Sequence, residues 1–137
     1  ARAQMMSAAI MGATAFQKGL GAIHALSHPV GAVFNTHHGT TNAICMPAVL
    51  KLNAPAIRDR FDLAASYIGI EGGFDGFCEF VQGFNDSLGI PRRLRELGVT
   101  HERVEDLVEM ALQDPSCGGN PVTLTADNIR ALFMDCV

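Results

Sequence analysis

Histidines gather in one short and almost uncharged segment of this chain. Four of the five fall within 15 residues: His24, His28, His37 and His38. No Lys, Arg, Asp or Glu occurs between Gly19 and Leu50. A stretch this apolar is expected to be buried, and burying imidazoles costs free energy unless each finds a partner. One metal ion would satisfy several neutral imidazoles together, so the segment predicts a transition-metal site.

The spacing of the histidines narrows the choice of ligands. His24 and His28 are four residues apart and would share one face of a helix. A later element could return His37 or His38 to the same point, which is an ordinary way to build such a site. Satisfied core or surface histidines are the alternative, and for His101, at an expected helix start, a surface role is the better interpretation.

Helical periodicity extends over nearly the whole chain. The expected helices cover residues 2–18, 23–34, 40–52, 54–72, 74–88 and 101–112, and a last helix is capped by Thr125. Only Val122 to Leu124 has a strand-like composition. The pattern predicts an all-α fold, an irregular helical bundle of about six to eight helices in a single domain, residues 1–137.

Prolines and large apolar residues refine this expectation. A break or kink is expected at His28-Pro29, a connector over residues 35–39, a bend at Pro47 and a new helix from Ala54-Pro55. Several large apolar residues at helical spacing are expected in the core: Met5, Met6, Phe16, Phe61, Phe77 and Phe80.

Composition excludes several functional classes. Apolar residues make up 48% and charged residues 18% of 137 residues, which is typical of a globular protein. The net charge of −4 without a basic cluster argues against nucleic-acid binding. Charged or polar residues interrupt every apolar stretch before it reaches membrane-spanning length. The four scattered cysteines are interpreted as reduced core thiols of a cytoplasmic protein.

The histidine segment resembles the second signature region of the iron-containing (group III) alcohol dehydrogenases. That pattern, G-x-x-H-A-x-(x)-H-x-x-G-A followed by H-G-x-x-N-A and an apolar residue with Pro, is matched by these residues: Gly21, His24, Ala25, His28, Gly31, Ala32, His38, Gly39, Asn42, Ala43 and Pro47. The resemblance implies the C-terminal helical, metal-binding domain of a dehydroquinate-synthase-like fold. It extends to Asn120-Pro121 in the late loop.

The resemblance implies specific roles for three histidines. The family holds one divalent metal, usually Fe2+ and sometimes Zn2+, with an Asp and three His between two domains. His24 and His38 match two of these ligands, which differs from the pair that spacing alone nominates. His28 matches a residue beside the metal, near the nicotinamide and the substrate, where it could relay the alcohol proton. His37 has no transferable role.

The implied reaction is oxidation of a primary or secondary alcohol to an aldehyde or ketone with NAD or NADP. The implied glycine-rich cofactor domain and the two other metal ligands belong upstream of Ala1, so we expect this chain to be a C-terminal part that is inactive alone. An apolar face without its neighbour would also favour a homo-oligomer. The alternatives are a helical metal-dependent hydrolase, disfavoured because Asp59 is the first acidic residue after the cluster, and a non-enzymatic interaction module with structural histidines.

Overall fold

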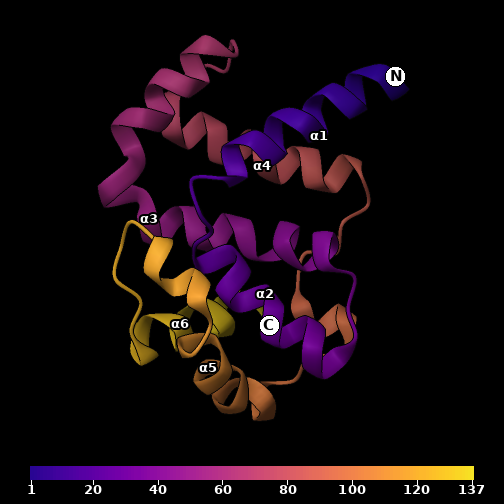
Figure 1. The fold of residues 1–137 in the computed structure, drawn as a ribbon, viewed down its shortest axis with the longest axis vertical. Helices are drawn as coiled ribbons and strands as arrows, with labels where there is room; N and C mark the ends of the chain where they lie inside the picture. Colours follow the sequence, from indigo (N-terminus) through magenta and orange to yellow (C-terminus); the bar gives the residue numbers. More distant parts are fainter.

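The computed structural model describes all 137 residues as helices joined by short connections, without a strand (Figure 1). The α-helices are α1 (Arg2–Phe16), α2 (Ala22–Phe34), α3 (His38–Tyr67), α4 (Gly73–Ser87), α5 (Val104–Leu112) and α6 (Ala126–Cys136). Three 3-10 segments lie between them, η1 (Leu94–Leu97), η2 (His101–Arg103) and η3 (Pro115–Gly119). The all-α prediction is confirmed, and the expected strand-like segment 122–124 is irregular.

Helix α2 carries two histidines and continues through Pro29. The break expected at this proline is therefore wrong. The apolar side of α2 is buried, with Ala25, Leu26 and Val30 each at most 1% exposed. Packing of a largely buried helix outweighs the loss of one backbone hydrogen bond at proline.

Helix α3 is one continuous helix where two were expected, over residues 40–52 and 54–72. It runs for 30 residues and includes both Pro47 and Pro55, so the expected boundary at residues 53–55 is wrong. Figure 1 shows α3 changing direction part-way along its length. Pro55 supplies a physical cause, because a helical proline lacks an N–H and its ring presses on the carbonyl four residues earlier.

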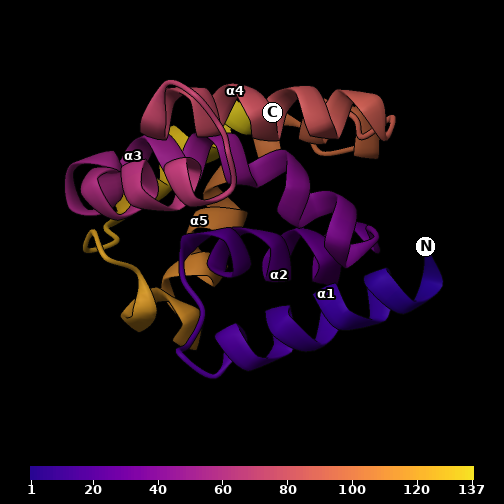
Figure 2. The same cartoon turned by 90° about the horizontal axis from the view of Figure 1, so that it is seen from above.

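Helix α1 stands apart from the rest of the bundle. Figure 2 shows α1 and α4 on opposite sides of the molecule, with α2 and α3 between them. All residues of α1 are exposed, including Met5 (69%), Met6 (66%) and Phe16 (51%). The core positions expected there are wrong because nothing in this chain covers α1; Phe80 is also exposed, whereas Phe61 and Phe77 are half-buried.

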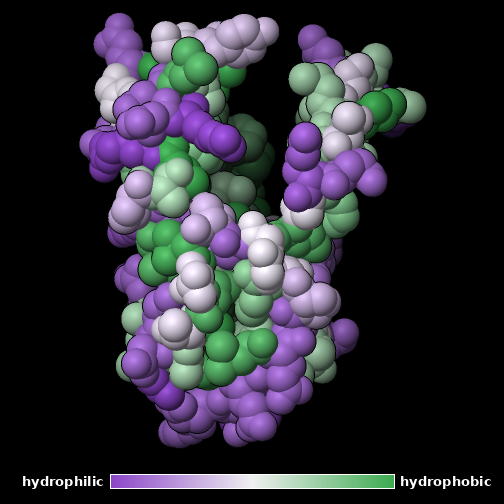
Figure 3. Space-filling model, turned by 60° about the vertical axis from the view of Figure 1, so that its left-hand side comes forward, coloured by the Kyte–Doolittle hydropathy of each residue, from purple (hydrophilic) through white to green (hydrophobic).

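An open gap separates α1 from the tip formed by α3 and α4. Figure 3 shows these elements rising as two separate arms from a common base. The main core lies in that base and joins α2, the first half of α3, α5 and α6 through 18 buried residues, among them Leu26, Leu107 and Phe133. A smaller cluster of Leu50, Phe74 and Val81 joins α3 to α4.

The helix starts were predicted with mixed success. Thr125 caps α6 through a hydrogen bond from Asn128 N, as expected. Thr100 instead precedes a 3-10 turn, and its hydroxyl donates to Glu102 rather than capping the helix. No helix combines the length and apolar character that crossing a lipid bilayer requires.

Candidate metal and proton-relay site

Three of the predicted histidines meet at the base of the gap. The ring of His24 lies 5.5 Å from that of His28 and 5.2 Å from that of His38, measured between centroids. His28 and His38 stack at 5.5 Å with 16° between their planes. Helix α2 supplies the first two rings one turn apart, and the first turn of α3 supplies the third.

Asn42 marks the point where two of these rings converge. Its Nδ2 lies 3.0 Å from Nε2 of His38 and 3.4 Å from Nε2 of His24. The two imidazole nitrogens therefore face one place, between α2 and α3. The Oδ1 atom of Asn42 is buried without a hydrogen-bond partner, which is uncommon for a polar atom in a protein interior.

His28 faces a different partner, which the sequence interpretation missed. Its Nδ1 lies 2.7 Å from Oδ2 of Asp114, a residue 86 positions away at the start of η3. Asp59 is the first acidic residue after the cluster in sequence, but Asp114, much later in the chain, supplies the carboxylate beside His28. The only local signal was Asp114-Pro115, which favours a capped turn.

Burial and charge set the protonation of this group. Burial, followed by the neighbouring His38 and His28, lowers the pKa of His24 below its ordinary value, with Asp114 acting in the opposite direction. The pKa of Asp114 is also lowered: its burial acts to raise it, but hydrogen bonds from Ser116 and His28 outweigh that effect. A neutral His24 has its lone pair available for a metal, and an ionised Asp114 can accept from His28.

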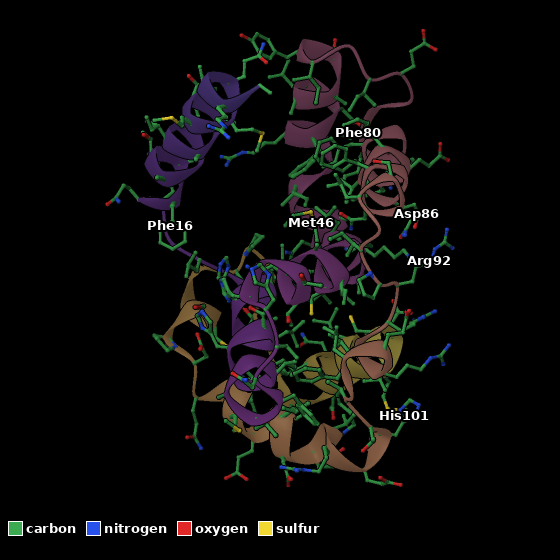
Figure 4. All side chains as sticks on the ribbon, turned by 90° about the vertical axis from the view of Figure 1, so that its right-hand side faces the viewer. Phe16, Met46, Phe80, Asp86, Arg92 and His101 are labelled. Atoms are coloured by element: carbon green, nitrogen blue, oxygen red, sulfur yellow. The ribbon has the colours of Figure 1, made fainter.

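The surroundings of His24 are apolar on two sides. The edge of the Phe16 ring meets His24 at a centroid distance of 5.9 Å. Figure 4 shows Phe16 at the foot of α1, across the gap from Met46 and Phe80. A cavity of about 360 Å3 also borders His24, and its walls include Leu20, Ile23, Leu50, Ile57, Phe61, Asn53 and Asn120.

The two remaining histidines lie outside this cluster of rings. His37 is exposed and sits just before α3, where its Nδ1 accepts a hydrogen bond from Thr40 N at 3.3 Å. His101 is exposed at the far end of the molecule from Phe16 (Figure 4), which agrees with the surface role expected for it.

The donors fit a divalent metal in type and in direction. The Nε2 atoms of His24 and His38 approach the same amide of Asn42, and imidazole nitrogen suits iron and zinc alike. No three His, Cys, Asp or Glu side chains converge closely enough to hold a metal by themselves. The Nε2 atoms of His24 and His38 thus share one neighbour, the amide of Asn42, whereas Nδ1 of His28 faces Asp114.

The chain matches one known protein family over its whole length. The model of the C-terminal part of the Fe-containing alcohol dehydrogenase family matches residues 1–137. The chain belongs to this family. Iron-containing alcohol dehydrogenases are oxidoreductases, which disfavours both the hydrolase and the non-enzymatic alternatives.

Individual members of the family resemble the chain over most of its length. It is 40% identical to 4-hydroxybutyrate dehydrogenase of Cupriavidus necator, over 97% of this chain and 37% of that protein. It is 33% identical to the NADPH-dependent butanol dehydrogenase of Clostridium saccharobutylicum, over 100% of this chain and 38% of that protein. The crystal structure of a 1,3-propanediol oxidoreductase superposes with a TM-score of 0.80 at 30% identity, covering 86% of this chain and 33% of that one. The chain thus spans about a third of the length of these relatives.

Proposed function

We propose that this chain forms the C-terminal, metal-binding part of an iron-dependent alcohol dehydrogenase. The observation that carries the proposal is the convergence of His24 and His38 on Asn42, with His28 beside them. Two imidazoles leave a tetrahedral site incomplete. Further ligands, and the domain that binds the cofactor, would come from polypeptide outside these residues, which is consistent with the share of its relatives that the chain spans.

In the proposed site His24 and His38 hold a divalent cation, Fe2+ or another such as Zn2+. The cation supplies Lewis acidity, which lowers the pKa of an alcohol hydroxyl. The side chains of this chain line the site and handle the proton of the alcohol. Phe16 and the apolar walls near His24 place apolar surface against this histidine, which reduces its contact with water.

His28 is the proposed proton relay and neighbour of the nicotinamide. Its Nδ1–H donates to Asp114, which leaves Nε2 with a lone pair that can take the proton of a substrate hydroxyl. Asp114 then stabilises the imidazolium that forms, as a carboxylate does in other His–Asp pairs. The side chain of His28 is 41% exposed, so a small alcohol can reach it from the gap.

The proposed reaction is oxidation of a primary or secondary alcohol to an aldehyde or ketone, with NAD or NADP accepting the hydride. The names of two relatives support this choice, since one is a dehydrogenase of a hydroxy acid and the other an NADPH-dependent butanol dehydrogenase. Apart from His28 beside the nicotinamide, the residues that bind the nucleotide are proposed to lie outside this chain.

A chimeric enzyme tests the proposal directly. Residues 1–137 would replace the matching segment of the Cupriavidus necator 4-hydroxybutyrate dehydrogenase, which is 40% identical. We expect the chimera to reduce NAD or NADP when an alcohol substrate and Fe2+ or Zn2+ are added. The reduced nucleotide would be measured by its absorbance. The 137-residue chain alone should show no turnover, because it lacks the cofactor domain.

The matched control is the same chimera with His24→Ala and His38→Ala. It should keep the melting transition of the chimera and lose both bound metal and activity. A chimera that folds, binds the nucleotide and remains inactive with every metal tried would refute the proposed function.

A further inference from the structure

The connection between α2 and α3 determines where His38 lies relative to the histidines of α2. Only Asn35, Thr36 and His37 separate the two helices. Asn35 ends α2 in the left-handed conformation, with φ of 52°, and its N–H donates to Gly31 O at 2.9 Å. Because this connection is so short, a change in the conformation of residues 35–37 directly affects the first turn of α3.

His37 is the N-cap of α3 and acts through its side chain. Its Nδ1 accepts from Thr40 N at 3.3 Å and lies 3.2 Å from Thr40 Oγ1. Ser, Thr, Asp and Asn usually perform this task, in which a side-chain acceptor satisfies an N–H that has no partner within the helix. The capping role occupies Nδ1, so that nitrogen is not available to a ligand.

The backbone of His37 strengthens the same turn. Its carbonyl accepts from Thr41 N at 3.0 Å and from Thr41 Oγ1 at 3.1 Å. The hydroxyl proton of Thr41 is used in its bond to the His37 carbonyl. In the 2.8 Å contact between Thr36 Oγ1 and Thr41 Oγ1, the hydroxyl of Thr36 is therefore the donor. Thr41 is fully buried, which anchors this network to the core.

His38 is the first residue of the turn that His37 caps. The first turn of a helix is where it frays most readily, because its N–H groups lack intrahelical partners. His38 is exposed, so packing alone does not hold its ring against His28 and His24. The cap therefore acts together with the buried Thr41 network and the contact between Asn42 and His38 in keeping this turn, and with it His38, in place.

We propose that His37 is a positioning residue that orders the first turn of α3 and so holds His38 in the metal-binding arrangement. The inference rests on the proposed function for its metal, but the cap itself does not. Gly39 leaves room for the capping ring, because a Cβ at this position would lie 3.3 Å from Cε1 of His37 and press on the imidazole. An imidazole can therefore perform here the task that a shorter polar side chain performs elsewhere.

Two substitutions separate positioning from any direct chemistry of the imidazole. His37→Ala removes the acceptor, whereas His37→Asn replaces it with a side chain that caps helices well. Both substitutions would be made in the chimeric enzyme, which supplies the remaining metal ligands and is the parent protein of this test. Its Zn2+ affinity would be measured by competition with a chelator, and amide hydrogen exchange at Thr40 and Thr41 would be measured in the same proteins. His101→Ala is the matched control, because His101 is exposed and distant from the site.

We expect His37→Ala to weaken Zn2+ binding about fivefold, the equivalent of the ~1 kcal/mol that loss of an N-cap costs. Exchange at Thr40 should accelerate, and His37→Asn should restore both measurements to within about twofold of the parent. Zn2+ binding that stays as weak in His37→Asn as in His37→Ala would overturn the proposal and assign the imidazole a direct role. Unchanged affinity in His37→Ala would also overturn it.

The two proposals can fail separately. If the parent protein does not bind Zn2+ while exchange at Thr40 still responds to His37→Ala, the metal site is refuted and the cap is real. If Zn2+ binds through His24 and His38 while exchange at Thr40 does not respond, the metal site stands and the positioning role of His37 is refuted.

Discussion

His28 and Asp114 meet at 2.7 Å although 86 residues separate them, and this pair joins the histidine helix to the late loop. The carboxylate is 11% exposed and also accepts from Ser116 N at 2.8 Å, so its orientation is well determined. Gly119 allows the approach of this loop, because a Cβ there would overlap the carbonyl oxygen of Leu20. Asp114 is therefore built into the site and is not a chance surface neighbour.

Asp114→Asn tests whether this pair assists proton transfer. The amide retains the shape and can accept one hydrogen bond, but it cannot stabilise a charged imidazolium. We expect kcat of the chimeric enzyme to fall about 10- to 100-fold, the range typical for loss of a supporting partner. Metal content should be unchanged. Asp106→Asn, which alters an exposed ion pair with Arg103, is the control, and an equal kcat for the Asp114 variant and the parent would exclude the relay role.

His24→Ala and His38→Ala test the assignment of the metal pair. Each substitution should weaken Zn2+ or Fe2+ binding more than about 100-fold, since changes outside the ligand shell alone cost 10- to 100-fold. Equilibrium dialysis with elemental analysis measures this loss. His28→Ala should leave the metal in place. If the double variant lost thermal stability and kept its metal, the histidines would be structural.

The fold class and the residues of the histidine cluster could be predicted, because both depend on local patterns. Apolar periodicity and uncharged composition are present in any window that contains His24 and His28. The role of Asp114 could not be predicted, since it arises from a tertiary contact that no spacing reveals. The continuity of α2 and α3 was also missed, because packing decided whether Pro29 and Pro55 ended a helix or only disturbed it.

The core positions expected in α1, and Phe80 in α4, failed for a related physical reason. Large side chains at helical spacing indicate a face that needs cover, but they do not say which polypeptide covers it. Met5 and Met6 remain exposed because α1 rises away from the bundle (Figure 3). Likewise, the pattern contained Asn42 as a motif position, yet only the structure shows its amide between two imidazoles.

Asn42 should select the tautomer of both metal-pair histidines in the metal-free protein. Its Nδ2 can donate to both Nε2 atoms only if these are unprotonated, which places the protons on Nδ1. The opposite amide orientation would bury an unpaired NH2 group in place of one carbonyl oxygen, which is less favourable. Nitrogen-15 NMR of labelled histidine should therefore show unprotonated Nε2 in His24 and His38.

A carboxylate at position 42 should reverse that preference. Asn42→Asp leaves only acceptors facing the rings, so Nε2 should become protonated in both histidines. Asn85→Asp is the control, because Asn85 is also half-buried but donates to Ala43 O and contacts no histidine. Identical spectra for the parent and Asn42→Asp would mean that Asn42 does not control the tautomers.

The ion pair between Glu105 and Arg130 predicts a pH dependence of stability. Arg130 donates to both carboxylate oxygens, at 2.6 and 3.0 Å, and these hydrogen bonds lower the pKa of Glu105 below its ordinary value. The unfolded chain therefore takes up the proton first as the pH falls. The stabilisation is fully present above the ordinary pKa of a glutamate and is lost as the pH falls through the lowered one.

Glu105→Gln should consequently melt slightly below the parent at neutral pH, by the small amount typical of exposed pairs, and the difference should disappear as the pH falls through the lowered pKa of Glu105. Glu109→Gln, on the same helix without an ion pair, should show no such trend. A difference in melting temperature that persists unchanged in acid would contradict the assignment.

Asn120 holds the start of α2, and with it His24, against the late loop. Its Oδ1 accepts from Ala22 N at 3.1 Å and from Asn53 Nδ2 at 2.9 Å. Its Nδ2 donates to Asn53 Oδ1 at 2.8 Å and to Val122 O at 2.7 Å. Asn120→Ala leaves the amide of buried Asn53 unpaired, and an unpaired buried polar group costs about 1–3 kcal/mol.

Chemical denaturation should therefore show Asn120→Ala to be less stable than the parent by about 2 kcal/mol. Replacing the partner as well, with Asn53→Leu in the same protein, should recover part of that loss because no unpaired amide remains. Asn128→Ala removes the side-chain hydrogen bonds of Asn128 with Thr125 N and Thr123 O but leaves the Thr125 cap in place. It should cost about 1 kcal/mol and is the control for losing an asparagine. If the loss of stability in the double variant instead equalled the sum of the losses in Asn120→Ala and Asn53→Leu, the two asparagines would act through separate contacts and not as a pair.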